Sequence, residues 1–286
     1  MKKWLKLTTA ALAVLAFATG CGNQAGTKES ASSESSKQEE VTVKLGLIGA
    51  DTDVWDSVKD RLKEEGINLE YVQFTEYSQP NTALANGDID LNSFQHQYFL
   101  DNFNSEHGTD LVSIGNTVNA PLGIYSEKIK DIKELKDGAK VAIPNDVTNG
   151  GRALLLLQTA GLIKVDEAAK QAPTVSDITE NPKNLDITEL EASQTARALQ
   201  DVDASIINSG MAVDAGFIPS EDAIYLEPVD DTSRPYVNII VARKEDENNE
   251  VYQKVVAAYQ TDETAKVIDE TSKGSSIPAW ETFGTK

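Results

Sequence analysis

Residues 83–94 read A-L-A-N-G-D-I-D-L-N-S-F, and residues 198–208 read A-L-Q-D-V-D-A-S-I-I-N. Each stretch has the pattern of a helix end, a tight turn with acidic residues, and then a strand. One copy lies in each half of the chain. Strands that alternate with helices at this spacing predict βαβ units. The repeat therefore predicts two α/β lobes, each a mostly parallel sheet flanked by helices.

The remainder of the chain continues this alternation. Period-two patterns or compact apolar runs predict further strands at 41–49, 67–74, 111–117, 120–126, 140–146, 185–190 and 234–243. Helical spacing predicts helices at 51–65, 81–86, 95–104, 129–138, 192–200 and 251–268, and a loop that leads into a helix over 148–162. Ligands of open α/β sheets bind beyond the carboxyl ends of the strands, so we expect a cleft between the lobes.

The first 20 residues have the composition of an export signal. Lys2, Lys3 and Lys6 precede the uncharged run A-A-L-A-V-L-A-F-A, and small residues follow it. This order is typical of a secretory signal peptide, and the run is shorter than the roughly 20 apolar residues of a spanning helix. We expect the signal peptide to end at residue 20.

Cys21 is the only cysteine of the 286 residues, so it has no intramolecular disulfide partner. A buried free thiol is one interpretation. The other follows from the sequence A-T-G-C at 18–21, which resembles a bacterial lipobox and makes Cys21 a lipidated N-terminal residue. Residues 22–40 are polar and rich in Ser and Glu, which predicts a flexible stalk. Together they predict a protein anchored by lipid on the extracytoplasmic face of the cell membrane.

The composition excludes some partners. The chain carries 46 acidic against 26 basic residues, a formal net charge of −20. A body this acidic repels nucleic acid and anionic lipid surfaces.

Catalytic motifs are missing from the sequence. It has no G-x-S-x-G and no H-E-x-x-H, and the second histidine, His107, lies in the polar stretch E-H-G-T-D. Paired carboxylates could support glycosidase chemistry, but acidic residues are too abundant for any pair to stand out. We therefore predict no enzymatic activity, no metal site and no cofactor.

The stretch N-D-V-T-N-G-G-R at 145–152 follows a predicted buried strand and leads into an apolar helix. Backbone N–H groups at a helix start favour an anion, and the planar fork of Arg152 suits a carboxylate. A turn with a surface arginine is the plain interpretation. The functional one is a ligand carboxylate held by Arg152 and by donors near Thr148 and Asn149.

The stretch N-S-F-Q-H-Q-Y-F-L-D-N-F at 92–103 is unusually aromatic. Helical spacing assigns Phe99, Leu100 and Phe103 to a core. His96 and Tyr98 are harder to bury without partners, and a structural histidine remains the alternative. We interpret the stretch as the wall of a ligand site, because it follows a predicted strand end.

Several of these motifs occur together, in order, in one known family. The A-T-G-C box, V-K-L-G, N-G-D-I-D-L-N-S-F-Q-H, N-A-P-L-G-I-Y-S, I-P-N-D-x-T-N-G-G-R-A-L and R-P-Y-V-N resemble the methionine-binding lipoproteins, the NlpA class of ABC importer components. The similarity covers essentially the whole chain after the signal.

The resemblance implies a two-lobed, periplasmic-binding-protein-like fold. It also implies a monomer that binds L-methionine or a related amino acid and delivers it to a membrane permease driven by an ATPase subunit. The implied lobes are 41–122 with 238–286, and 123–237. The implied ligand-binding residues are Tyr77, Phe94, His96, Tyr98, Asn149, Arg152, Asn208 and Asn238.

Within this set the resemblance gives Arg152 to the ligand carboxylate. It gives Asn208 and Asn238 to the amino and carboxylate groups, and the aromatic residues with His96 to the thioether. Two alternatives remain open: a dipeptide-binding importer component, and a surface adhesin or structural lipoprotein with a vestigial cleft.

Overall fold

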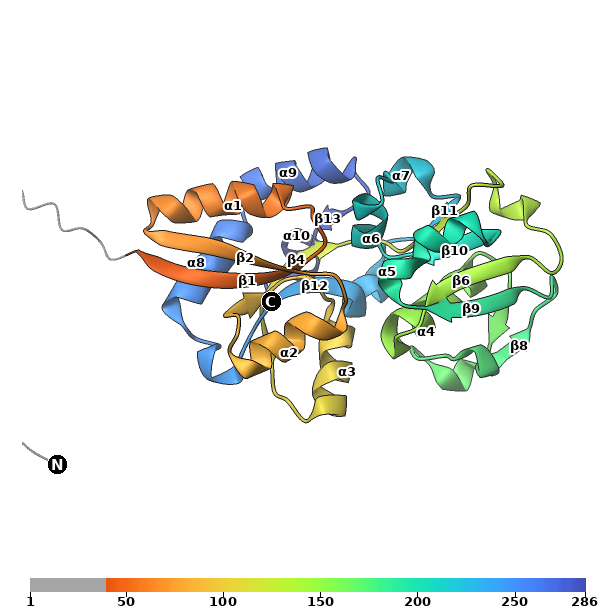
Figure 1. The fold of residues 1–286 in the computed structure, drawn as a ribbon, viewed down its shortest axis with the longest axis horizontal. Coiled ribbons are helices and arrows are strands. Elements are labelled where there is room, and N and C mark those ends of the chain that lie inside the picture. The colour runs from red at the N-terminus through yellow and green to blue at the C-terminus, as the bar shows by residue number, and fades with distance from the viewer. Residues whose placement is uncertain (1–39) are drawn as a thin grey trace, which may run out of the picture. The chain divides into compact units, whose positions relative to one another are not determined.

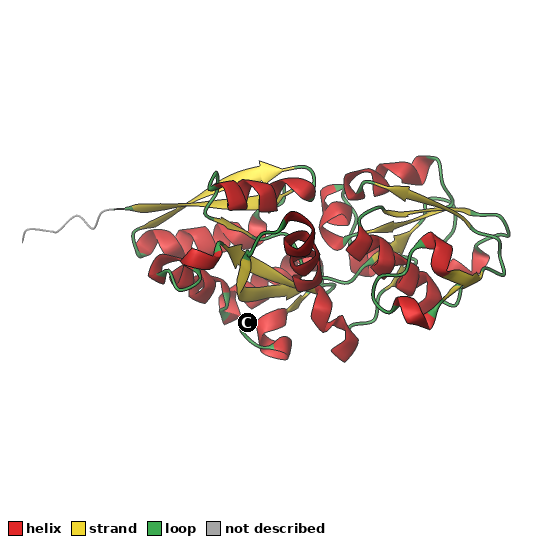
Figure 2. Ribbon diagram, turned by 90° about the horizontal axis from the view of Figure 1, so that it is seen from below, coloured by secondary structure: helices red, strands yellow, loops and turns green. Residues whose placement is uncertain are grey.

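The computed structural model describes residues 40–286, which contain two separate β-sheets with their own helices (Figures 1 and 2). The predicted signal peptide, Cys21 and almost all of the predicted stalk lie outside these residues. We call the six-stranded sheet with its helices the first lobe, and the five-stranded sheet with its helices the second lobe.

The first lobe has the strand order β13-β4-β12-β3-β1-β2. Its strands are β1 (Val41–Ile48), β2 (Ile67–Phe74), β3 (Leu91–Asn92), β4 (Val112–Asn119), β12 (Val237–Ala242) and β13 (Ile277–Pro278). Its helices are α1 (Asp53–Glu64), α2 (Ser78–Asn86), α3 (Gln97–His107), α8 (Glu250–Tyr259), α9 (Asp262–Ser272) and α10 (Ala279–Phe283).

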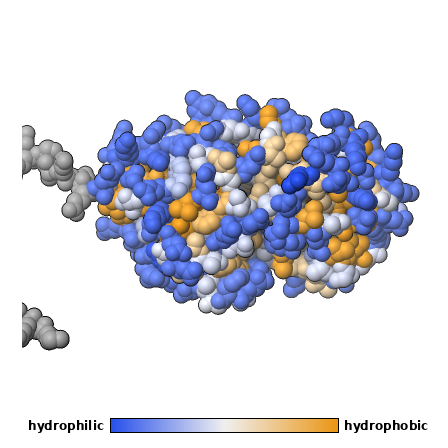
Figure 3. Space-filling view, in the orientation of Figure 1, coloured by the Kyte–Doolittle hydropathy of each residue, from blue (hydrophilic) through white to orange (hydrophobic). Residues whose placement is uncertain are grey.

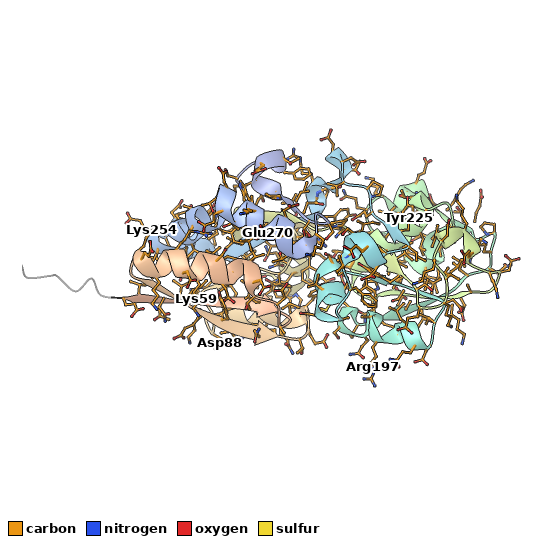
Figure 4. All side chains as sticks on the ribbon, turned by 90° about the horizontal axis from the view of Figure 1, so that it is seen from above. Lys59, Asp88, Arg197, Tyr225, Lys254 and Glu270 are labelled. Atoms are coloured by element: carbon orange, nitrogen blue, oxygen red, sulfur yellow. The ribbon has the colours of Figure 1, made fainter. Side chains whose placement is uncertain are left out.

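Strand β12 is buried on both faces, and its residues alternate between two apolar cores. Ile240 and Ala242 pack with α1, α8 and α9, whereas Ile239 and Val241 pack with α2 and α3. Successive side chains of a strand point to opposite faces, so helices cover both faces of the sheet. Charged side chains of these helices, such as Lys59 on α1, Lys254 on α8 and Glu270 on α9, lie at the periphery (Figure 4).

The second lobe has the strand order β11-β5-β10-β6-β9, and a separate two-stranded ribbon joins β7 and β8. Its strands are β5 (Gly123–Tyr125), β6 (Lys140–Pro144), β7 (Lys164–Val165), β8 (Ile178–Glu180), β9 (Asp186–Leu190), β10 (Ala204–Ile207) and β11 (Tyr225–Leu226). Its helices are α4 (Val147–Thr159), α5 (Ala192–Thr195), α6 (Ser209–Asp214) and α7 (Pro219–Asp222). Ile206 packs with the α4 core, and its neighbour Ile207 packs with α5 and α6 on the other face.

Parallel pairing is confined to part of each sheet. Strands β2-β1-β3 and β10-β6-β9 are parallel, as the βαβ pattern predicts, while β4, β12 and β13, and likewise β5 and β11, pair antiparallel. The antiparallel strands β4, β5, β11 and β12 flank the two passages of the chain between the lobes, at 120–122 and 227–236. Parallel neighbours need a crossover connection, which is usually a helix. The strands next to these passages have no such connection, so they can pair antiparallel.

Four helix predictions are wrong in detail. The predicted helix 192–200 is the short helix α5 at Ala192–Thr195 followed by a 3₁₀ turn at Arg197–Gln200. The predicted helix 129–138 is only a 3₁₀ turn at Ile132–Glu134, and the predicted helix 251–268 is two helices, α8 and α9. The second begins because the Thr261 side chain accepts a hydrogen bond from the Thr264 N–H and caps a new helix. The stretch predicted as a loop before a helix is already helical from Val147.

Most of the surface seen in Figure 3 is hydrophilic, with apolar residues scattered over it. Between residues 40 and 286, only Val41, Val147 and Val229 are large apolar residues with exposed side chains. Over the same range no helix is long and apolar enough to cross a membrane.

Candidate functional site

A cavity of about 230 Å³ is lined by residues of both lobes. The second lobe contributes Asn149, Arg152, Asn208, Ser209 and Gly210, and the first lobe contributes the remaining lining residues. Small-molecule clefts commonly measure roughly 300–1,000 Å³. This cavity is smaller than that range, so it suits a small ligand.

Aromatic rings form one wall of the cavity. Tyr77, Phe94 and Phe99 contact one another with ring centroids 5.8–6.0 Å apart. Trp55 at the start of α1 and Tyr259 at the end of α8 form a second pair, 4.7 Å apart, that also lines the cavity. Phe99, which its spacing assigned to the core, therefore faces the site. These rings offer an apolar surface with polarisable faces.

His96 connects this wall to the second lobe. It is the N-cap of α3, where its Nδ1 accepts a hydrogen bond from the Phe99 N–H at 3.0 Å. The ring proton therefore lies on Nε2, which donates to Asn149 Oδ1 at 3.3 Å. Burial, and secondarily the positive charge of Arg152, lowers the pKa of His96 from 6.5 to about 3. His96 is thus a neutral hydrogen-bond donor at physiological pH.

A cluster of buried amides lies behind the turn that carries Phe94 and His96. Asn81 Nδ2 donates to Gln95 Oε1 at 2.7 Å, and Asn92 Nδ2 donates to Asn81 Oδ1 at 2.9 Å. Gln95 Nε2 donates to Asn92 Oδ1 at 2.9 Å, which closes the network. Buried polar groups need such partners, and here they tie the turn between β3 and α3 to helix α2.

The first turn of α4 projects the Asn149 side chain toward the cavity. Asp146 caps the helix by accepting the Asn149 N–H at 2.9 Å, and its carboxylate also accepts from Asn149 Nδ2 at 3.0 Å. The Asn149 amide is thereby oriented with Oδ1 toward His96. Gly150 permits close packing, because a Cβ there would lie 2.8 Å from the Pro144 carbonyl oxygen. The two glycines of N-G-G-R therefore lie within helix α4, where the absence of a Cβ allows neighbouring backbone to approach closely.

Arg152 is buried and already paired. Its Nε donates to Glu227 Oε1 at 3.0 Å, and its Nη2 donates to Glu227 Oε2 and to the Ala120 carbonyl oxygen. Its guanidinium also lies over the Tyr236 ring, 4.3 Å from the centroid. Within residues 40–286, Nη1 has no hydrogen-bond partner, so this one nitrogen remains available to a ligand.

Asn208 follows strand β10 at the start of α6. Its Nδ2 donates to Asn149 Oδ1 at 2.7 Å, but its buried Oδ1 has no partner among the described residues. A buried acceptor without a donor costs free energy, so this oxygen calls for a donor inside the cavity. An ammonium or amide group of a ligand would supply one.

Seven of the eight predicted ligand-binding residues line this cavity, namely Tyr77, Phe94, His96, Asn149, Arg152, Asn208 and Asn238. Asn238 lies beside His96, because the two residues form an isolated antiparallel bridge. Tyr98 is placed differently. It lines a separate surface depression with Gln97 and Asp101, and its ring stacks on His96 with centroids 6.5 Å apart.

Several cavity residues have no distinctive signal in the sequence. Trp55, Asp51 and Asp53 lie at the start of α1 and line the cavity, yet their spacing only predicts an ordinary helix. Glu227 pairs with Arg152 across 75 positions of sequence. Nothing in its local sequence predicts that pairing, since it depends on the packing of β11 against β5.

Two α/β lobes that share a cavity with polar and aromatic walls define a protein of the solute-binding class. Similarity to known proteins identifies the family within this class. The family model for NlpA lipoproteins matches residues 43–280. The chain therefore belongs to the NlpA lipoprotein family, and it has a two-lobed, periplasmic-binding-protein-like fold.

Two relatives illustrate the similarity. The D-methionine-binding lipoprotein MetQ of Salmonella typhi is 44% identical over 242 residues, which are 83% of this chain and 88% of that protein. The probable D-methionine-binding lipoprotein MetQ of Vibrio cholerae is 42% identical over 96% of this chain and 97% of its own length.

Solved structures show the same fold. A nutrient-binding protein from Burkholderia cenocepacia, bound to methionine, is 45% identical with a TM-score of 0.79, covering 83% of this chain and 99% of that one. Protein PG110 from Staphylococcus aureus is 48% identical with a TM-score of 0.80, covering 82% of this chain and 93% of that one.

Proposed function

We propose that this protein is the extracytoplasmic substrate-binding component of an ABC importer and that it captures L-methionine. The observation that carries the proposal is the buried Asn208 Oδ1, which has no partner among residues 40–286, beside an aromatic wall in a small cavity. Arg152 also lines this cavity, and its hydrogen bonds within those residues use only Nε and Nη2, which leaves Nη1 for a ligand. An amino acid matches all three features. Its ammonium group can donate to Asn208 Oδ1, its carboxylate can accept from Arg152 Nη1, and its side chain can pack on the aromatic wall.

The polar end of the cavity suits a zwitterion. At the buried part of the cavity Arg152 and its partner Glu227 balance each other in charge, and His96 is neutral, while Asp51 and Asp53 line the cavity from exposed positions. A ligand without net charge can enter such a site and leave no charge unpaired. In this proposal the ligand ammonium donates to Asn208 Oδ1, the carboxylate accepts from Arg152 Nη1, and Asn238 completes the polar contacts.

The aromatic end suits a thioether. Tyr77, Phe94 and Phe99 surround an apolar space, and sulfur contacts to aromatic rings contribute about 0.3–1.5 kcal/mol each. His96 closes this wall toward the polar end. Tyr98, which stacks on His96, would act by holding that ring in place.

Binding is favoured over catalysis by the state of the one histidine in the cavity. Both ring nitrogens of His96 are engaged in hydrogen bonds within the protein, and its pKa of about 3 makes it a poor base at neutral pH. The expected lobes, 41–122 with 238–286 and 123–237, need one adjustment, because strand β12 of the first lobe begins at Val237. We accordingly assign Val237 to the first lobe, and ligand capture to closure of the lobes around the passages between them.

The proposal extends to the N-terminal region. Residues 1–20 would direct export, Cys21 would carry the lipid anchor, and residues 22–40 would form the stalk from which the binding body presents ligand to a permease and its ATPase. The relatives' names as lipoproteins support this arrangement.

The test is isothermal titration of the full-length chain in mild detergent with L-methionine, D-methionine, leucine and a methionine-containing dipeptide. We expect one L-methionine per chain and much weaker binding of leucine, which lacks the sulfur. Preference for D-methionine would overturn the assigned stereochemistry, and preference for the dipeptide would overturn the substrate. No heat with any of the four would favour the surface-adhesin alternative.

A further inference from the structure

Asp214, the last residue of α6, connects the two lobes. It is exposed, and its Oδ1 accepts hydrogen bonds from the backbone N–H groups of Ala50 at 3.1 Å and Asp51 at 3.4 Å. Ala50 and Asp51 belong to the turn between β1 and α1 of the first lobe. One carboxylate thus binds two consecutive amides across the gap between lobes, on the side of the second lobe nearest the first (Figure 1).

The turn is shaped to receive this carboxylate. Gly49 has a φ of +83°, which is in the left-handed region that favours glycine. A Cβ at Gly49 would also lie only 1.8 Å from Asp214 Oδ2. Any other residue at this position would push the carboxylate away from the two amides.

The two elements joined by this contact, α6 and the turn after β1, each also contribute residues to the cavity lining. Helix α6 begins with Ser209 after Asn208, both of which line the cavity, and ends with Asp214, which does not. On the other side, Ile48 and Asp51 of the turn line the cavity. At 1.5 Å per residue, α6 is about 9 Å long, so the ligand end and the Asp214 end of α6 move as one short element.

We propose that Asp214 is a positioning residue for ligand retention, a latch that closes on the turn at 49–51 when α6 docks on the bound ligand. The proposal rests on the proposed function, since it requires a ligand in the cavity. The two hydrogen bonds run between lobes, so they exist only when the lobes are together. Loss of the latch lowers the closed fraction, and the apparent affinity falls by the same factor. The effect appears mainly in the dissociation rate.

The experiment uses the full-length chain in mild detergent and compares Asp214→Ala, Asp214→Asn and wild type. The matched control is Glu221→Ala on α7, an exposed carboxylate that makes no side-chain hydrogen bond within residues 40–286. The measurements are the methionine dissociation rate by stopped flow, the dissociation constant by titration, and the melting temperature of the ligand-free protein.

We expect Asp214→Ala to raise the dissociation rate roughly threefold to tenfold, the range for one ordinary hydrogen bond, because exposure to water weakens the two bonds of this carboxylate. Asp214→Asn should lie between Asp214→Ala and wild type, and Glu221→Ala should equal wild type. The ligand-free melting temperature should be the same in all four proteins. Unchanged dissociation in Asp214→Ala would overturn the latch, and so would a weaker affinity that tracks a lowered ligand-free melting temperature. Absence of binding in wild type would instead contradict the proposed function itself.

Discussion

Asn149 Oδ1 is the atom at which polar side chains of both lobes meet. It accepts from His96 Nε2 of the first lobe and from Asn208 Nδ2 of the second. The first contact crosses between the lobes. The second fixes the Asn208 amide so that its Oδ1 has no donor within residues 40–286. The arrangement leaves an acceptor ready for a ligand without any rearrangement of side chains.

Replacement of Asn208 by Ala should therefore weaken methionine binding more than it weakens the fold. The lost hydrogen bond has a charged donor in the ligand, and such bonds contribute about 1.5–3 kcal/mol, which is roughly tenfold to a hundredfold in affinity. Titration calorimetry measures the change. Asn248→Ala, at an exposed asparagine, is the control. Equal affinities of Asn208→Ala and wild type would exclude Asn208 from the ligand contacts.

Because the pKa of His96 is lowered in the folded protein, we expect the free energy of unfolding to decrease at acidic pH. The unfolded chain takes up a proton on His96 near pH 6.5, whereas the folded protein does so only near pH 3. Between these values the unfolded state binds more protons, so the His96 contribution to stability is complete above pH 6.5 and is lost as the pH falls. The loss is about 1.4 kcal/mol per pH unit.

The variant His96→Asn isolates this contribution, because asparagine can still cap α3 but does not titrate. Urea unfolding between pH 7 and pH 4 should show a shallower fall of stability in the variant than in wild type. Parallel curves for the two proteins would mean that the pKa of His96 is the same in the folded and the unfolded states, which would contradict its depression by burial.

We expect the buried ion pair of Arg152 and Glu227 to be important for the stability of the fold. Their side chains are 4% and 16% exposed, so removal of Glu227 leaves a buried guanidinium short of its counter-ion. Glu227→Ala should cost about 3–5 kcal/mol of unfolding free energy. The control is Glu180→Ala, which breaks the Lys164 pair with side chains 63% and 57% exposed and should cost less than about 1 kcal/mol. Similar losses in both variants would contradict the role assigned to burial.

At the scale of elements, helix α4 shows how a cap can also shape a site. Asp146 caps α4 through the Asn149 N–H and separately holds the Asn149 Nδ2. Serine at this position can cap the helix, but it is too short to hold the amide as well. The two roles of Asp146 are therefore separable by substitution.

Asp146→Ser should keep nearly all of the stability and yet weaken methionine binding, since Asn149 is no longer oriented. Asp146→Ala should in addition lose about 0.5–2 kcal/mol of stability. Thermal unfolding and titration of both variants test this separation. If Asp146→Ser bound methionine like wild type, the orientation of Asn149 would not depend on Asp146.

Elements with strong local patterns were predictable from sequence, and elements decided by tertiary contacts were not. The alternation of V-T-V-K-L-G-L-I and I-N-L-E-Y-V-Q-F predicts β1 and β2 nearly to the residue. By contrast, the helical spacing of apolar residues continues without interruption over 251–268, although α8 ends at Tyr259 and α9 begins at Asp262. The Thr261 cap that starts α9 does not disturb this spacing, so the spacing does not reveal the break. Likewise, G-G in N-G-G-R has the composition of a turn, and only the packing of α4 against β6 makes it helical.

At the scale of the whole molecule, the candidate site depends on residues far apart in the chain. The polar members at 96, 149, 152 and 208 could be named because each follows a strand end or a helix start, where α/β folds place ligands. The residues at the start of α1 have no such local signal, since the close approach of two lobes brings them to the cavity. Glu227 has none either, because it reaches the site only through its pairing with Arg152. Tyr98 shows the opposite case, because it lies inside the aromatic stretch 92–103 but its side chain lies outside the cavity.

The central claim is that the cavity holds methionine. The most direct test is mass spectrometry of the small molecules released when the protein, purified without added ligand, is denatured. We expect methionine at close to one molecule per chain. Release of no small molecule, together with no heat on titration with methionine, would contradict this claim.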